Sequence, residues 1–375
     1  ILIVPIHLRS KAVPLSVQRG FSDMRKNQYN ALLFLFILAL TNGCKDPFSF
    51  NTNASSGQLT VDGGITNLPG PYRLKLGRTQ GTARAPGGVT GATIIATDDQ
   101  GLQEAYHEVA EGTYELPGTT IHGAPGRTYF IDIVLPSGAH YQSVPDKLPG
   151  ALAKDSAWFK LNTVNLVSSE GIPISRPVID IFFNAKLPTA SAYLRWNVDE
   201  VYRFYPTCFP NPFNSCPEPC YITQAVSLSK IVLASTKDLA GNQLSNVHLQ
   251  QREPDNTFLS MHYFNVNQYS LSEAAHTYWK HVQQLTEHTG SIFDTPVANL
   301  KGNVFNVNDP KEVVYGYFEA AGSKTIHVGV ARGYLPFELP DPCRFKPGFG
   351  TAYPSTCLNC LSIENSTHVQ PAWFN

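Results

Sequence analysis

Cysteine is the residue type whose positions in this sequence point most clearly to chemistry. Seven cysteines are present, and the first, Cys44, follows ten consecutive apolar residues at 31–40 and the small or polar residues 41–43. A methionine and two basic residues at 24–26 precede the apolar run. A basic start, a short apolar run and small residues are typical of a secretory signal peptide, whereas a helix that spans a bilayer needs about 20 apolar residues. We therefore predict a signal peptide at 24–43.

Cys44 itself is the predicted attachment site for lipid. The stretch Thr41-Asn42-Gly43-Cys44 resembles a bacterial lipobox, in which the cysteine becomes the first residue of the mature protein and carries lipid on its sulfur. A strict lipobox has leucine three positions before the cysteine, where this chain has Thr41. Two or more acyl chains hold a protein at a membrane that it does not span. Residues 1–23 are then an extension ahead of the true start. The alternative for the apolar run is a buried helix.

The other six cysteines predict disulfides between distant parts of the chain. An even number of cysteines in an exported chain is typical of disulfide bonding. They form two groups of three, so at least one bridge must join the groups if all six pair. The alternative is a zinc site, because Cys357-x-x-Cys360 has metal-ligand spacing, but a second such pair is absent from the sequence. We expect no metal. The six are Cys208, Cys216, Cys220, Cys343, Cys357 and Cys360.

A search for catalytic motifs finds neither a nucleophile elbow nor a phosphate-binding loop. The acids Glu104, Glu108, Asp199 and Glu200 could form a glycosidase pair, since two such carboxylates need only lie about 5–9 Å apart in space. The alternative is that these acids lie on solvated strand edges. We expect a protein that is not an enzyme and holds no cofactor.

The segment 201–221 is the predicted binding loop, because it combines aromatic residues, prolines and three cysteines. Prolines and disulfides order a loop before its partner arrives, which lowers the entropic cost of binding. The alternative is that the rings pack on their own domain. The candidate contact residues are Tyr202, Phe204, Tyr205, Phe209 and Phe213.

A modification site is suggested by Asp155-Ser156-Ala157, which matches the Asp-Ser/Thr-aliphatic pattern of O-glycosylation in Bacteroidetes. The tripeptide lies just past a proline- and glycine-containing stretch that is typical of a linker. An exposed sugar on Ser156 would be tolerated there.

The elements that position these residues are predicted to be mainly β-strands in two β-sandwich domains. Residues 44–150 show short alternating strands with frequent turns, typical of an immunoglobulin or prealbumin sandwich, and end in the linker. Residues 151–375 form a β-rich domain with a cysteine-containing tail. Its one prominent helix is expected at 271–288, with a capping box at Ser270 and Glu273. The three histidines of this helix are spaced by five and seven, which does not suit a shared metal site.

Composition limits the partners. Without residues 1–43 the chain keeps 23 of its 28 Lys and Arg and 28 of its 29 Asp and Glu, a net charge of 23 − 28 = −5. A negative chain without basic clusters is not expected to bind nucleic acid. Charged residues make up only 15% of the sequence, below the usual value of about 25%. This low charge and the 28 prolines and 28 glycines fit a strand-and-turn protein outside the cytoplasm.

The segment 263–320 resembles the signature of a Bacteroidetes lipoprotein family known as domain of unknown function 4249. The shared strings are Tyr-Ser-Leu-Ser, Tyr-Trp-Lys, Thr-Gly-Ser-Ile-Phe-Asp, Gly-Asn and Gly-Tyr-Phe, in this order. The resemblance implies an outer-membrane lipoprotein of a kind often encoded beside TonB-dependent transporters, and it carries over only one functional residue, Cys44. We therefore expect a lipid-anchored, non-catalytic accessory or ligand-binding partner of such a transporter. The alternatives are a surface hydrolase of glycans and a structural or adhesive envelope protein.

Overall fold

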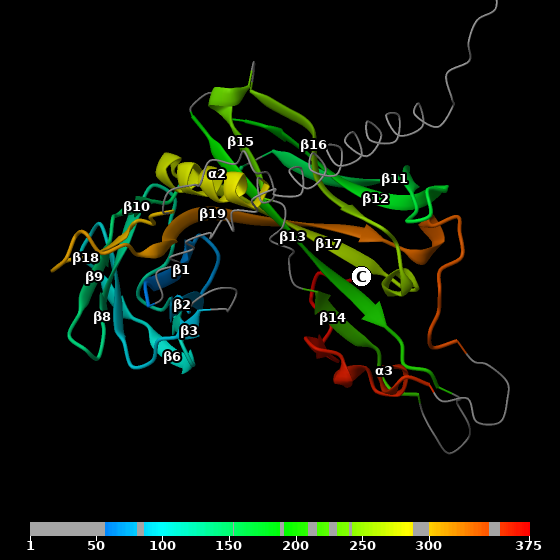
Figure 1. The fold of residues 1–375 in the computed structure, drawn as a ribbon, viewed down its shortest axis with the longest axis horizontal. Helices are drawn as coiled ribbons and strands as arrows, with labels where there is room; N and C mark the ends of the chain where they lie inside the picture. The colour runs from blue at the N-terminus through cyan, green and yellow to red at the C-terminus, as the bar shows by residue number, and fades with distance from the viewer. Residues whose placement is uncertain are drawn as a thin grey trace, which may run out of the picture. The chain divides into compact units, whose positions relative to one another are not determined.

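The protein is mainly β in a computed structural model, which describes most of the chain (Figure 1). The described residues are 57–80, 86–152, 154–187, 191–208, 216–224, 231–239, 242–287, 300–344 and 353–375. Their strands form three sheets. Cys44 and the predicted signal peptide lie outside the described residues.

The largest sheet has 11 strands among the described residues. Its neighbouring strands are antiparallel, except for one parallel pair, β1 and β19. Two short strands pair off the main path, β15 (Val232–Ser235) with β13 and β3 (Gly87–Gly88) with β2. The order across the sheet is β20 (Ser366–Thr367), β14 (Cys220–Gln224), β13 (Tyr193–Phe204), β17 (His262–Leu271), β19 (Tyr315–Val330), β1 (Leu59–Thr66), β2 (Tyr72–Arg78), β7 (Thr113–Leu116) and β6 (His107–Ala110).

Two smaller sheets complete the strands of the described chain. The second sheet has six strands and the third has three. In the second sheet the order is β18 (Val304–Asn306), β9 (His140–Ser143), β8 (Thr128–Val134), β4 (Thr93–Asp98) and β5 (Gln103–Ala105), with β10 (Asp146–Lys147) also on β8. In the third sheet the order is β11 (Asp155–Val167), β12 (Pro173–Lys186) and β16 (Gln243–Arg252).

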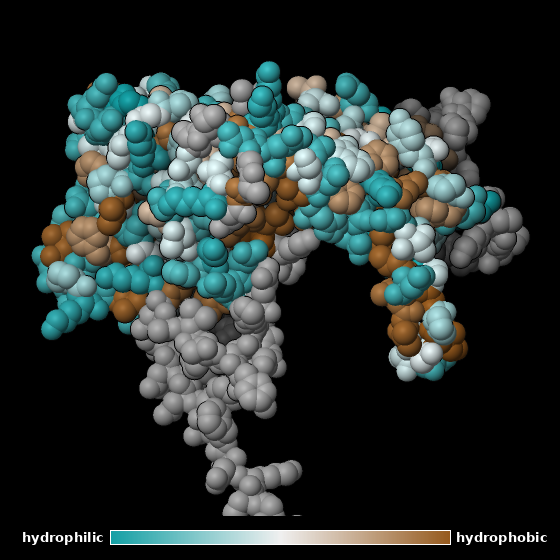
Figure 2. Space-filling view, turned by 90° about the horizontal axis from the view of Figure 1, so that it is seen from above, coloured by the Kyte–Doolittle hydropathy of each residue, from teal (hydrophilic) through white to brown (hydrophobic). Residues whose placement is uncertain are grey.

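Two hydrophobic cores lie between these sheets. The first core joins β1, β2 and β7 of the large sheet to β4, β8 and β9 of the second sheet. The second core joins β13, β17 and β19 to β12 and β16 of the third sheet. Alternation along each strand decides which side chains enter a core: Leu194, Trp196 and Val198 of β13 are buried in the second core. Figure 2 shows hydrophilic residues over much of the coloured surface, with hydrophobic patches between them.

Two separate sandwich domains divided at residue 150 are not confirmed. The segment 304–330, predicted to belong to the second domain, supplies strands to the sheets of the first. β18 pairs with β9, and β19 pairs with both β1 and β17. These are pairings between residues far apart in the sequence, and alternation within one strand does not specify its neighbour.

The predicted helix is present as α2 (Glu273–Glu287), and its start differs from the prediction at 271. Leu271 is the last residue of β17, and the capping residue is Ser272, whose Oγ accepts a hydrogen bond from the Ala275 N–H at 3.1 Å. The Ser270 hydroxyl instead accepts from Gln268. Residue 288 lies outside the described residues. The other helical segments of the described residues are α3 (Ser355–Leu358), η1 (Thr236–Asp238), η2 (Asn256–Phe258), η3 (Arg332–Tyr334) and η4 (Cys360–Ser362).

The helices of the described residues were compared with the length and hydropathy that a membrane span requires. None of the helices in the described part of the chain is both long enough and apolar enough to cross a bilayer.

The described residues form three disulfides, and one of them joins the two cysteine groups as the sequence predicts. Cys208 bonds Cys216 and Cys343 bonds Cys357, each within its own group. The third bridge, Cys220–Cys360, joins the groups across a sequence separation of 140. It ties β14 at the edge of the large sheet to the C-terminal tail, and both half-cystines are buried.

We expect the long-range bridge to contribute more stability than a short one. Replacing Cys220 and Cys360 by serine should lower the free energy of unfolding by about 5 kcal/mol, because the bridge closes a long loop in the unfolded chain. The matched variant without Cys208–Cys216, whose separation is 8, should lose about 2.5 kcal/mol. Urea unfolding with linear extrapolation measures both values. Equal losses would contradict this assignment.

Candidate functional site

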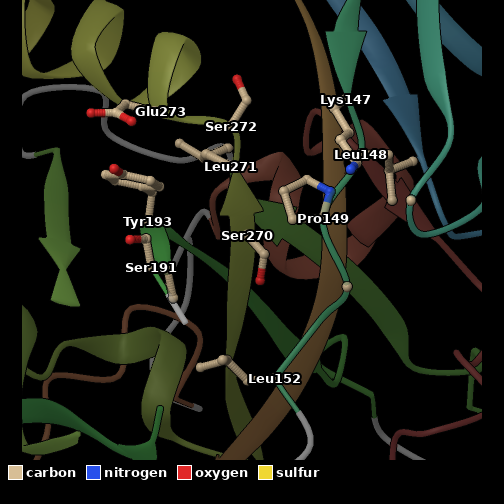
Figure 3. Close-up of a pocket in the computed structure, with 13 residues that line it drawn as sticks. Lys147, Leu148, Pro149, Leu152, Ser191, Tyr193, Ser270, Leu271, Ser272 and Glu273 are labelled. Atoms are coloured by element: carbon tan, nitrogen blue, oxygen red, sulfur yellow. The ribbon is translucent and has the colours of Figure 1, made fainter. Parts of the chain in front are cut away.

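A pocket of about 500 Å³ lies where the chain passes from the first core to the second. The passage is the segment 147–152, in which Leu148 belongs to the first core and Leu152 to the second. The other walls are the start of β13 and the turn between β17 and α2. Figure 3 shows Ser191 and Tyr193 on one side of Ser270 and residues 147–149 on the other. Pockets of this volume at the junction of two cores are common binding sites for small molecules.

The lining of this pocket is mainly apolar, with a few polar groups at its edges. Apolar carbon comes from leucines, a proline and an alanine, and hydroxyl groups come from three serines and a tyrosine. Lys147 and Glu273 supply the charged groups. The lining residues are Gly126, Lys147, Leu148, Pro149, Gly150, Leu152, Ser191, Ala192, Tyr193, Ser270, Leu271, Ser272 and Glu273.

Glu273 is held as an anion at the rim of the pocket. The Lys237 ammonium donates a hydrogen bond to its carboxylate, and this bond lowers the pKa of Glu273 and raises the pKa of Lys237. The same ammonium lies 5.6 Å from the centre of the Tyr193 ring. Both partners of the ion pair are exposed, so the pair orients Glu273 and contributes little to stability.

Asp146 is an unusual residue beside the pocket, because it is a carboxyl group that is only 4% exposed. Burial raises its pKa to about 6 from the ordinary 3.8, and hydrogen bonds from the Ala320 N–H and the Ser272 side chain partly oppose this. The Ala320 N–H lies 3.0 Å from Oδ2. The sequence predicts a linker at the end of residues 44–150 and predicts neither the burial of Asp146 nor the pocket, since nothing local marks a carboxyl group as buried.

The predicted binding loop is not one exposed surface in the part that the structure describes. Tyr202 is only 6% exposed and packs with the Cys220–Cys360 bridge, and Phe204 packs partly against the same cluster. Tyr202 and part of Phe204 therefore pack on their own domain, which is the alternative stated for this loop. Tyr205 is 55% exposed, with the Arg203 guanidinium 5.2 Å from its ring centre. Phe209 and Phe213 lie outside the described residues.

The acids considered for a glycosidase pair do not converge. Glu104 accepts hydrogen bonds from the backbone N–H groups of residues 119–121, and Glu108 accepts from the Gly91 N–H. Asp199 and Glu200 are neighbours on β13, so their side chains point to opposite faces of the sheet. All four carboxylates have separate structural partners.

A Thr257–His262–Glu200 chain has the partners of a catalytic triad and lacks its geometry. His262 lies between the two, with Nδ1 3.3 Å from the Thr257 hydroxyl and Nε2 3.1 Å from Glu200. The hydroxyl, however, donates to Asp255 at 2.6 Å, and His262 is completely buried. A nucleophile needs a base that takes its proton and a path for substrate, so this group is structural.

His276, one of the three helix histidines whose spacing argued against a metal site, is also buried, with its ring centre 5.3 Å from that of Tyr193.

The disulfide pairing argues against the alternative of a zinc site at Cys357 and Cys360. Cys357 and Cys360 bond to two different partners, so neither provides a thiolate. His368 lies 3.8 Å from the Cys220 sulfur, and these two with Cys360 form the one cluster of metal-ligand residue types among the described residues. Its sulfurs form the long-range disulfide.

The remaining predicted site, the O-glycosylation candidate Ser156, is exposed near the start of the edge strand β11.

Comparison with known proteins places the chain in a family. A family model described as a domain of unknown function (DUF4249) matches residues 45–327. The match covers most of the chain, and the protein belongs to this family. No curated protein and no solved structure matches the chain. The function must therefore be argued from the site itself.

Asp146 predicts how stability depends on pH. Because its pKa is about 6 in the folded protein and near 3.8 when unfolded, the ionised carboxylate disfavours the fold, and stability falls as pH rises between these values. Asp146→Asn keeps the acceptor and removes the charge. We expect its stability relative to wild type to rise by about 2 kcal/mol from pH 4.5 to pH 7.5. Urea unfolding at both pH values tests this. Glu338→Gln, a change at a side chain that is 98% exposed, should show no such rise, and a pH-independent difference for Asp146→Asn would contradict the expectation.

Proposed function

We propose that this protein is a lipid-anchored envelope protein that binds a small amphipathic ligand without transforming it, as an accessory partner of an outer-membrane TonB-dependent transporter. The pocket between the two cores carries the binding part of the proposal. Its volume of about 500 Å³ suits a small molecule, and its apolar walls suit a hydrocarbon part. The serine hydroxyls and Lys147 at the edges suit a polar end.

The absence of a converging catalytic group in the described residues supports binding over hydrolysis. General acid–base catalysis needs two groups within reach of one bond. Asp199 and Glu200 point to opposite faces of the sheet, and Glu104 and Glu108 are each bound to backbone N–H groups of their own surroundings. The polar groups at the pocket are hydroxyls, an ammonium group and a carboxylate that is already paired with Lys237. These groups can orient a ligand.

The proposed location and partner of the protein rest on the predicted signal peptide and on the family resemblance. Lipid on Cys44, directly after the proposed signal peptide, would hold the protein on a membrane surface. The three disulfides suit an oxidising compartment outside the cytoplasm. A tethered binding protein near a transporter raises the effective concentration of its ligand at the transporter entrance.

The anchor predicts where the protein is found. In cells, the wild-type chain should fractionate with the outer membrane and co-purify in mild detergent with a TonB-dependent transporter, because its acyl chains hold it there. Cys44→Ala should appear in the soluble fraction without the transporter. The double variant Cys208→Ser/Cys216→Ser is the control that loses cysteines and keeps the anchor. A soluble wild-type protein with an unmodified N-terminus would refute the anchor, and recovery from membranes without a transporter would refute the partner.

A side chain that fills the pocket should block the binding of a ligand there. Gly150 lines the pocket, and a Cβ added there would meet only Pro125, at 4.0 Å. Gly150→Phe should therefore fold normally and occupy the space of the ligand. We expect it to lower the affinity for the apolar probe 1-anilinonaphthalene-8-sulfonate at least tenfold in a fluorescence titration.

The matched control for this variant is Gly333→Phe. Gly333 is exposed in η3, and an added Cβ there has nothing within 4 Å. It should leave both probe affinity and melting temperature unchanged. Equal probe binding by the two variants would show that the pocket is not the binding site.

A further inference from the structure

A row of polar side chains crosses three strands of the large sheet on the face away from the second core. Along β13, residues 194, 196 and 198 enter that core, so residues 197 and 199 lie on the other face. The strand register aligns them with residues of β17, which in turn align with residues of β19. We call these side chains the polar strip: Asn197, Asp199, Asn265, Asn267, Thr325 and His327.

Hydrogen bonds connect the polar strip from strand to strand. Asp199 accepts from the amide groups of Asn265 and Asn267, each at 2.7 Å. The Thr325 hydroxyl donates to Asn267 Oδ1 at 2.7 Å. His327 Nδ1 lies 2.8 Å from Asn265 Oδ1. Such a network fixes its side chains before any ligand binds.

The direction of these bonds leaves an acceptor on His327. A carboxylate only accepts, so the Asn265 amide nitrogen faces Asp199 and its oxygen faces the imidazole. His327 therefore donates through Nδ1, and Nε2 carries a lone pair in the neutral ring. Partial burial lowers the pKa of His327, although the nearby Asp199 charge opposes this, and the ring stays neutral at pH 7. Nε2 has no hydrogen-bond partner among the residues that the structure describes.

Asp199 also keeps acceptor capacity. A carboxylate offers about four lone-pair positions, and the described structure fills two of them. The comparison is Asp180 in the third sheet, which accepts from Asn162, His248 and Gln251 at 2.8–3.0 Å and is only 3% exposed. Asp180 is nearly saturated by its own sheet. Asp199, in contrast, is partly exposed, and the residues of its own sheet do not saturate its acceptor positions.

An indole ring closes one end of the polar strip. Trp373 of the C-terminal tail stacks on the His327 imidazole with ring centres 3.9 Å apart and planes within 7°. Tyr263 meets the indole edge-on at 5.3 Å. Trp373 is itself only partly buried, so part of the ring system borders the strip and is open to contact.

The other end of the polar strip is closed by a neutralised cation. The Arg195 guanidinium lies between the rings of Tyr269 and Trp279, 4.5 and 4.1 Å from their centres. Its charge is matched by Glu319, at 2.8 Å. Asp199 therefore remains as the one charged side chain of the strip itself, and it disfavours an anionic ligand.

We propose that the polar strip is a binding site for a neutral carbohydrate, whose hydroxyl groups donate to Asp199 and His327 and whose C–H face packs against Trp373. Acceptors that the protein leaves free suit a ligand rich in donors, and sugar hydroxyls supply several from one ring. An aromatic ring beside fixed polar groups suits the apolar face of such a ring. This site is distinct from the pocket between the cores and does not depend on the function proposed for that pocket.

A glycan array with the full chain tests the proposal. The probes are neutral oligosaccharides of glucose, mannose, galactose and xylose, with sulfated and sialylated oligosaccharides as the anionic set. We expect binding to at least one neutral class. Titration calorimetry with that oligosaccharide should then show at least a tenfold loss of affinity in Asp199→Asn and in Trp373→Ala, because a charged hydrogen bond or a stacking surface is removed.

Matched controls separate this site from others on the molecule. Asp180→Asn and Trp158→Ala change the same residue types on the third sheet and should keep the affinity within twofold, as should the pocket variant Gly150→Phe. Melting temperatures of all variants report folding, and the two strip variants lie on different elements, so one remains informative if the other unfolds. The proposal is overturned if no neutral glycan binds, if the anionic set is preferred, or if the third-sheet variants lose as much affinity as the strip variants.

Discussion

The pairing of β19 with two partners is the constraint on which the rest of the structure depends. Residues 315–321 of this strand pair in parallel with β1, and residues 322–330 pair antiparallel with β17. One continuous strand thus belongs to both cores. The parallel half needs Gly316, whose φ is 88° and whose added Cβ would lie 1.9 Å from the Val61 carbonyl oxygen. Only glycine allows this approach, so the first core depends on a residue about 250 positions later in the sequence.

Strand β13 shows how the same sheet separates structural from exposed polar groups. Glu200 faces the side of the second core, where Gln250, Arg252 and His262 bind its carboxylate. Asp199, its neighbour in sequence, faces the opposite side and meets only amide groups. A strand places consecutive residues on opposite faces, so two adjacent acids cannot act on one bond. Adjacent acids in a strand are therefore evidence against a catalytic pair.

Local features of the structure were predictable from the sequence, and non-local ones were not. The β content and α2 follow from periodicity, and the odd number of cysteines in each group requires a bridge such as Cys220–Cys360. The β1–β19 pairing leaves no local signal, because any alternating strand fits several neighbours. The pocket was missed for the same reason: its walls come from four separate segments, and residues 147–152 carry only the signals of a linker.

The position of Asp146 links the pocket to β19. Its carboxylate accepts from the backbone of Ala320, so the segment that enters the pocket wall is attached to the strand shared by both cores. A buried carboxylate with a raised pKa costs stability at neutral pH, and an asparagine could accept the same hydrogen bond without that cost. Strongly shifted titratable groups beside a cavity are characteristic of functional sites. The junction of the two cores is therefore the part of this fold where a cost in stability and a pocket coincide, in keeping with the binding proposed for that pocket.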